Sequence, residues 1–172
     1  DHYQRPSRTR LNAVRPLVIL AFDYGTKRIG VASGDTLTGT ARALTTLEAK
    51  NTNSNFESGI PWPAIDKLMR EYQPAQLVVG LPWNMDGTPT LLTEASRAFG
   101  AALEARYHKP VALVDERLSS REAEAQLRDA RAAGIKKRRN THADVDMIAA
   151  KILLEQWLRN PTPPSDTQKQ TS

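Results

Sequence analysis

The chain carries the apolar run Leu17-Val-Ile-Leu-Ala-Phe22, which passes into Asp23-Tyr-Gly-Thr26 and then into Arg28-Ile-Gly-Val-Ala32. A near-continuous apolar run of this length is typical of a central strand that is buried on both faces of a sheet. Asp23-Tyr-Gly-Thr26 has the composition of a turn, so strand character is expected to resume at Arg28. A third strand is predicted for Thr40 to Leu47, close behind. We therefore expect the first three strands to form an antiparallel meander.

Helices and strands alternate in the remainder of the chain. The expected elements are a helix at 63–72, a strand at 76–81, a helix from Thr88-Pro89 (N-cap and first residue) to about Tyr107, a strand at 111–114, a helix opened by a Ser119/Glu122 capping box and ending near Gly134, and a helix at 142–158. Strands separated by helices are added to a sheet in parallel. The predicted fold is therefore α/β, with a mixed five-stranded sheet and helices on both of its faces.

Polar segments flank this predicted domain. Residues 1–15 are rich in arginine and lack periodicity, which predicts a flexible basic arm, and the proline, serine, threonine and glutamine of residues 160–172 predict a disordered tail. The folded domain is expected over 16–159. At this size one hydrophobic core suffices, because a domain of ~150 residues buries about 68–70% of its unfolded surface.

Composition excludes several classes of site and location. The chain has no cysteine, so disulfides, zinc–thiolate sites and thiol nucleophiles are excluded. The first fifteen residues have no apolar segment like that of a signal peptide. The run at 17–22 is far shorter than the ~20 residues that span a bilayer. We expect a cytoplasmic protein with no membrane partner.

The positive charge of the chain is concentrated in one segment. Arg117 to Arg139 contains eight basic and three acidic residues, and the rest of the chain has sixteen of each sign, so the whole net charge of +5 lies there. A local basic surplus attracts polyanions through counterion release and long-range steering. The alternative is a solvated helix face, which is what most charge runs are.

Three acidic positions are candidates for chemistry. Asp23 ends a buried strand, where an ionised carboxylate needs a cation, hydrogen-bond donors or water, although aspartate is also common in turns. Asp115 and Glu116 close the fifth strand and point to opposite faces, so alternation alone does not say which of them faces Asp23. At about 100° per residue, Asp146 projects into an apolar helix face, which consists of Ala149, Ala150, Leu153 and Trp157.

Helical projection separates Asp146 from the nearby Asp144, which is expected on the solvent side of the same helix with Lys151 and Glu155. An acid within a packing face usually serves an ion or a chemical step, although a carboxylate in the first turns also interacts well with the helix dipole. Carboxylates from a strand, a strand end and a helix start make a site of oxygen ligands only. Such a site suits Mg²⁺ or Mn²⁺, and a pair of these ions can hydrolyse a phosphodiester without a protein nucleophile.

Three segments together resemble the YqgF family, also called RuvX, whose members are pre-ribosomal-RNA nucleases similar to Holliday junction resolvases. They are Phe22-Asp-Tyr-Gly-Thr-Lys-Arg-Ile-Gly-Val31, Val79-Gly-Leu-Pro-Trp-Asn-Met-Asp-Gly-Thr88 and Asp115-Glu-Arg-Leu-Ser-Ser120. Val145-Asp146 followed by Ala149-Ala150 is a fourth match, and the order and spacing hold across 17–158.

The resemblance implies a ribonuclease H-like fold, a divalent metal cofactor and a catalytic, metal-binding set of Asp23, Glu116 and Asp146. It thereby chooses Glu116 over Asp115. It also implies a role in maturing the 5′ end of 16S ribosomal RNA. Thr26 and the basic residues around this set are then candidate nucleic-acid contacts, and the basic residues are Lys27, Arg28, Arg117, Lys136, Lys137, Arg138 and Arg139.

Other functions compete with this interpretation. A Holliday-junction DNA resolvase would use the same acids on branched DNA. The segment Asp23-Tyr-Gly-Thr26 also resembles the first phosphate loop of actin-like ATPases and sugar kinases, but those need two such domains and this chain has one. A non-catalytic RNA-binding module would use only the basic segment and would leave Asp146 unexplained.

Overall fold

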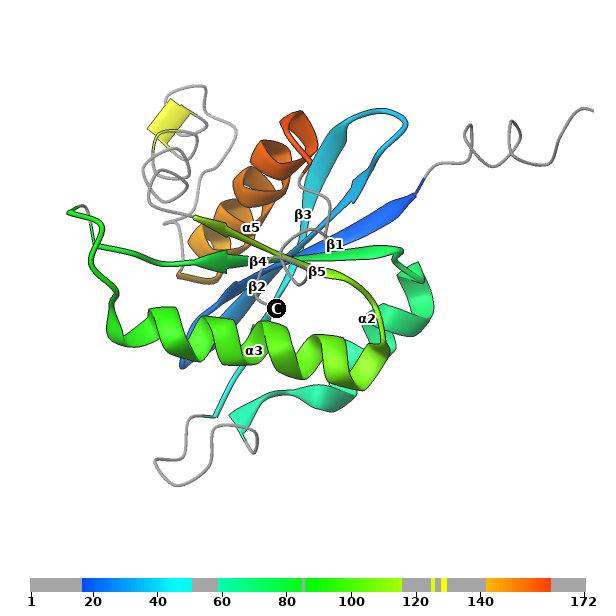
Figure 1. Ribbon diagram of the computed structural model, residues 1–172. Helices are drawn as coiled ribbons and strands as arrows, with labels where there is room; N and C mark the ends of the chain where they lie inside the picture. The colour runs from blue at the N-terminus through cyan, green and yellow to red at the C-terminus, as the bar shows by residue number, and fades with distance from the viewer. Residues whose placement is uncertain are drawn as a thin grey trace, which may run out of the picture.

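The computed structural model describes residues 17–50, 59–84, 86–115 and 142–161, together with Ala125, Arg128 and Asp129. Within these ranges, five strands form one sheet in the order β3-β2-β1-β4-β5 (Figure 1). The strands are β1 (Val18–Tyr24), β2 (Arg28–Asp35), β3 (Thr40–Glu48), β4 (Gln76–Leu81) and β5 (Val111–Asp115). β1, β2 and β3 pair antiparallel, whereas β4 and β5 join β1 in parallel. The predicted mixed sheet, a meander followed by two parallel strands, is confirmed.

Helices cover both faces of the sheet, as predicted. α2 (Trp62–Tyr72) and α3 (Leu91–Tyr107) pack on one face, and α5 (His142–Arg159) packs on the other, against β1, β2 and β3 (Figure 1). Side chains alternate along a strand, and β1 is therefore shared between two cores. Leu20 and Phe22 point to the α2/α3 side, and Ile19 and Ala21 point to α5.

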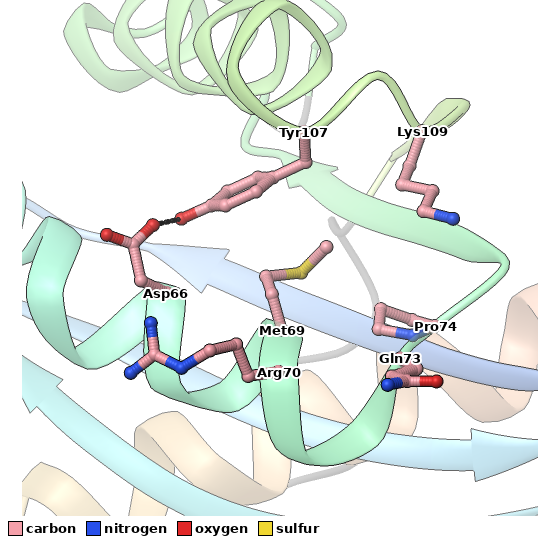
Figure 2. Close-up of a pocket in the computed structure, with 7 residues that line it drawn as sticks. All are labelled: Asp66, Met69, Arg70, Gln73, Pro74, Tyr107 and Lys109. Carbon is pink, nitrogen blue, oxygen red and sulfur yellow. Dashed lines mark hydrogen bonds between the residues drawn. The ribbon is translucent and has the colours of Figure 1, made fainter.

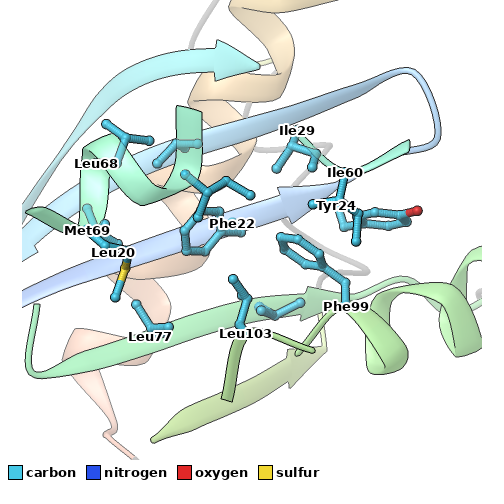
Figure 3. Packing of buried hydrophobic residues seen from close by; sticks show 13 residues of the cluster. Leu20, Phe22, Tyr24, Ile29, Ile60, Leu68, Met69, Leu77, Phe99 and Leu103 are labelled. Carbon is cyan, nitrogen blue, oxygen red and sulfur yellow. The ribbon is translucent and has the colours of Figure 1, made fainter. Parts of the chain in front are cut away.

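The core on the α2/α3 side is rich in aromatic rings (Figure 3). Phe99 of α3 meets Phe22 edge-on at 5.7 Å between ring centroids and stacks on Tyr24 at 5.0 Å. Aromatic pairs in these arrangements contribute beyond the area that they bury. Tyr24 is the last residue of β1, so this packing fixes the end of the strand that carries Asp23.

One predicted helix boundary was wrong. α3 begins at Leu91 with Thr90 as its N-cap, and the Thr93 side chain completes a capping box. Thr88, the predicted cap, instead donates from its backbone N to Asp86 Oδ1 at 2.9 Å, and Pro89 forms an isolated bridge with Trp83. The Asp86 side chain holds Thr88 in a turn, so the helix starts at the next threonine.

Several predicted segments lie outside the described residues. They are the arm at 1–15, the helix expected between Ser119 and Gly134 apart from three of its residues, and the tail beyond Pro161. In the helices that the structure describes, no stretch is long and apolar enough to cross a membrane.

Candidate active site

Asp23 lies on the face of the sheet that α5 covers. It follows Ile19 and Ala21 at the two-residue period of β1, and both of those side chains pack against α5. Gly30 of β2 is its antiparallel partner and therefore shares its face. Asp23 is half-buried, unlike the fully buried residues 19–22 before it. The strand thus carries the carboxylate out of the core to a partly open position beside the helix.

Gly30 brings the backbone of α5 against the sheet at Asp146. A Cβ built on Gly30 would lie 2.0 Å from the carbonyl oxygen of Asp146 and 3.1 Å from its Cβ. Only glycine permits so close an approach between a strand and another backbone. Since Gly30 pairs directly with Asp23, Asp146 lies next to Asp23 on the same face.

Thr46 of β3 holds the start of α5 from the far side of Gly30. It is paired with Gly30 across the strands, and its hydroxyl donates to the carbonyl oxygen of Ala143 at 2.7 Å. A neutral hydrogen bond of this kind contributes about 0.5–1.5 kcal/mol. Thr46 and Gly30 together fix where the helix turn that carries Asp146 lies over the sheet and how close it comes to the strands.

Arg28 reaches Asp146 from the first residue of β2. Its Nε donates to Asp146 Oδ2 at 2.8 Å, with 34% of the Arg28 side chain and 24% of the Asp146 side chain exposed. Sequence reasoning had assigned Arg28 to substrate phosphates and did not anticipate this contact. The neighbouring Lys27 is exposed and Thr26 is half-buried, both in the turn between β1 and β2.

The remaining predicted site residues are only partly described. Asp115 is the last residue of β5 and shares the face of Val111, which packs into the α2/α3 core. Ala112 and Val114 lie on the other face and pack toward α5. Glu116, Arg117 and the four basic residues 136–139 lie outside the described residues. Within the described ranges, no three acidic or histidine side chains are grouped closely enough to hold a metal ion.

The environment of α5 agrees with its predicted apolar face but not with its predicted solvent face. Ala149, Ala150, Leu153 and Trp157 are buried. Asp144 is half-buried rather than solvent-exposed, as are Lys151 and Glu155, so the expectation for that side of the helix was wrong. The reason is the breadth of the contact: α5 packs against β1, β2, β3 and β4, so more than one stripe of it is covered.

A pocket of about 420 Å³ lies away from these acids, between α2 and α3 (Figure 2). Its lining includes Gln73 and Pro74, which precede β4, and Lys109, which precedes β5. It therefore lies at the amino ends of the parallel strands, whereas Asp23 lies near the carboxyl end of β1. Ligands of open α/β sheets bind at the carboxyl ends, which favours the edge with Asp23.

Comparisons with known proteins identify the family of the chain. The family model described as "RuvX: Holliday junction resolvase" matches residues 17–160. The chain belongs to the RuvX family. Relatives named "Putative pre-16S rRNA nuclease" include one from Yersinia enterocolitica, 47% identical over 81% of this chain and 92% of the relative, and one from Dechloromonas aromatica, 42% identical over 83% and 91%. This RuvX chain is therefore a nuclease, as predicted, and the kinase-like and non-catalytic alternatives are disfavoured.

Solved structures place the fold of this RuvX member. RuvC of Thermus thermophilus in complex with a Holliday junction substrate aligns with a TM-score of 0.53 at 17% identity, over 85% of this chain and 97% of RuvC. Another structure of the same RuvC aligns with a TM-score of 0.52 at 12% identity, over 83% and 96%. The expected ribonuclease H-like fold is confirmed.

Proposed function

We propose that this nuclease hydrolyses phosphodiester bonds with divalent metal ions, Mg²⁺ or Mn²⁺, that are held by Asp23, Glu116 and Asp146. The observation that carries the proposal is the contact of Gly30 with Asp146, because it brings two acids that are distant in sequence to one place on the sheet. Oxygen-only ligands fit hard divalent ions.

Glu116 is proposed as the third ligand, in preference to Asp115. The β5 side chains that pack toward α5 are those of Ala112 and Val114, so alternation favours the next even position for the face of Asp23. Divalent ions held by these residues would supply activation of a water molecule and stabilisation of the leaving oxygen. The protein would contribute the carboxylates and the basic residues that hold the phosphates.

For the substrate, we propose 16S ribosomal RNA precursor, cleaved in maturation of its 5′ end. The names of the relatives support this choice, and it implies action in the cytoplasm. Branched DNA is the second candidate, supported by the family description. Candidate phosphate contacts are Thr26, Lys27, Arg28, Arg117, Lys136, Lys137, Arg138 and Arg139.

The first test replaces Asp146 by asparagine. Asp146→Asn keeps the shape of the side chain but removes charge needed for metal binding, so we expect cleavage to fall at least ~100-fold, as loss of ~3 kcal/mol of transition-state stabilisation would give. RNA affinity in EDTA should not fall, because the carboxylate does not bind the RNA. Asp144→Asn, two residues away on the same helix, is the matched control and should retain activity. Equal losses in both variants would contradict the assignment.

The second test compares substrates. The wild-type protein is incubated with Mg²⁺ or Mn²⁺ and with 16S precursor RNA, unstructured single-stranded RNA or a four-way DNA junction. We expect cleavage of the precursor near its mature 5′ end, dependent on the ion. Preferential cutting of the DNA junction would favour the second candidate, and cleavage that persists in EDTA would overturn the metal mechanism.

A further inference from the structure

The contact between Arg28 and Asp146 bridges 118 residues of sequence inside the candidate site. Arg28 opens β2 directly after the turn that follows Asp23, and it lies on the α5 face with Gly30 at the two-residue period of the strand. Its Nε donates to Asp146 Oδ2 at 2.8 Å. One oxygen of the proposed metal ligand is therefore already bound to a cation of the protein itself.

We infer that Arg28 is an exchangeable counter-ion: it occupies Asp146 when no metal is bound, and it yields that carboxylate to the ion and turns to a substrate phosphate. The inference rests on the proposed function. A guanidinium has five donors and no lone pair for a metal, so it competes with the ion for Asp146 and does not join it in the coordination shell. Two cations at one carboxylate also repel each other.

The environment of the pair allows the exchange. Both side chains are partly exposed, at 34% and 24%. An ion pair so exposed to water is weak. The paired state is favoured over the separated state by a factor of only a few. Once released, a guanidinium matches the oxygens of a phosphate in bidentate geometry.

Exchange of this kind couples the two ligands of the enzyme. If metal binding frees Arg28 for the phosphate, then substrate that engages Arg28 also removes the competitor of the metal, and the two couplings are equal by linkage. Arg28 would then be a positioning residue that delays full carboxylate–metal contact until substrate is present. A purely structural ion pair gives no such reciprocity.

The test is calorimetric titration of Mn²⁺ into the full-length wild-type protein, Arg28→Gln and Lys27→Gln. Lys27→Gln is the matched control, because it removes the same charge from the adjacent exposed position. We expect Arg28→Gln to bind Mn²⁺ about three- to ten-fold more tightly than wild type, the range that loss of a partly exposed competitor predicts. Lys27→Gln should change the affinity less than about two-fold, as expected for a solvent-screened charge.

Substrate kinetics supply the second readout. At saturating Mn²⁺, Arg28→Gln should raise the KM for precursor RNA although its Mn²⁺ affinity has increased, and Arg28→Lys should fall between the two proteins in both measurements. Circular dichroism spectra establish that each variant is folded. Unchanged or weaker Mn²⁺ binding by folded Arg28→Gln would overturn the counter-ion role. Failure of the wild-type protein to bind Mn²⁺ would instead overturn the proposed metal site, and the inference with it.

Discussion

At the scale of single residues, Asp66 offers a measurable pH dependence. Its carboxylate accepts hydrogen bonds from Arg106 at 3.0 and 2.9 Å and from the Tyr107 hydroxyl at 2.6 Å. These hydrogen bonds join α2 to α3, and Figure 2 shows the one from the tyrosine. The hydrogen bond from Arg106 has the largest effect and that from Tyr107 the next largest, and together they lower the pKa of Asp66 to about 2. Burial is the main cause that raises the pKa of Tyr107, and the hydrogen bond with Asp66 raises it further.

A carboxylate whose pKa is lower in the folded state stabilises the fold above its unfolded pKa of about 3.9 and loses that contribution as pH falls through the folded value. We therefore expect Asp66→Asn to melt below wild type at pH 5, with the difference in Tm shrinking as pH falls toward 2. Thermal melts across this range check it. Glu71→Gln, which changes an exposed acid of the same helix, is the control and should show only a small difference in Tm. A constant difference for Asp66→Asn would be contrary to the prediction.

Individual residues also show what the sequence could reveal of the site. Asp146 could be proposed from the sequence because a helical projection is local, and the apolar residues that this projection places beside it are buried. The contact with Arg28 was not identified, because nothing in a sequence reports a pairing across 118 residues. Gly30 carried a usable signal: a glycine inside a strand often marks a close approach of another backbone, and here that backbone belongs to Asp146.

At the scale of elements, the docking of α5 on β2 controls the geometry of the site. In Gly30→Ala the added Cβ would lie 2.0 Å from the Asp146 carbonyl oxygen, so the helix must move away from the sheet. Overpacking of this kind costs about 1–3 kcal/mol or more. We expect Gly30→Ala to lower the free energy of unfolding by at least that amount and to weaken Mn²⁺ binding in the fraction that remains folded. Denaturant melts and metal titration measure the two effects.

Gly100→Ala is the control for that experiment. It makes the same chemical change on the opposite face of the sheet, where the new Cβ would lie 3.0 Å from a methyl group of Leu113 and 3.5 Å from one of Val111. Those side chains can shift, and alanine is favoured over glycine in a helix by about 1 kcal/mol. Metal affinity should stay at the wild-type value. If Gly30→Ala also kept that value, the close approach would not determine where Asp146 lies.

Helix boundaries show why the sequence located elements better than their ends. Thr88 and Thr90 are both acceptable N-caps, and Pro89 is well suited to the first helical turn. The choice fell to Thr90 because the Asp86 side chain binds both the backbone N and the hydroxyl of Thr88, at 2.9 and 2.6 Å. Local propensity does not rank two such caps, since the deciding contact belongs to the turn before the helix.

At the scale of the whole molecule, hydrophobic pattern was enough for the architecture. An apolar run at 17–22 correctly predicted a doubly covered central strand, because only a strand buried on both faces tolerates such a run. Alternation of helices and strands then gave the parallel additions. The exposure of Asp144 was not predictable in this way. That exposure depends on how many strands cover α5. The periodic pattern of one helix carries no information about the elements that pack against it.

The placement of charge over the molecule leads to the last prediction. Lys136, Lys137, Arg138 and Arg139 lie outside the described residues, but in sequence they come just before α5, the helix that carries Asp146. We expect replacement of all four by glutamine to weaken RNA binding and to flatten its salt dependence, because each lost phosphate contact lowers the slope of log K against log salt by ~0.7–0.9. Turnover at saturating RNA should persist, since these residues do not ligate the metal and uniform binding energy acts mainly on KM.

A matched control removes the same charge elsewhere. Lys67, Arg70, Arg97 and Lys109 are exposed and belong to the α2/α3 side of the sheet, opposite α5. A quadruple glutamine variant there lowers the net charge equally, so any general loss of attraction to RNA appears in both proteins. A local phosphate contact instead appears as a smaller salt slope only in the 136–139 variant. Equal slopes in the two variants, measured by binding titrations over a salt series, would mean that net charge alone attracts the RNA and that the segment before α5 does not touch it.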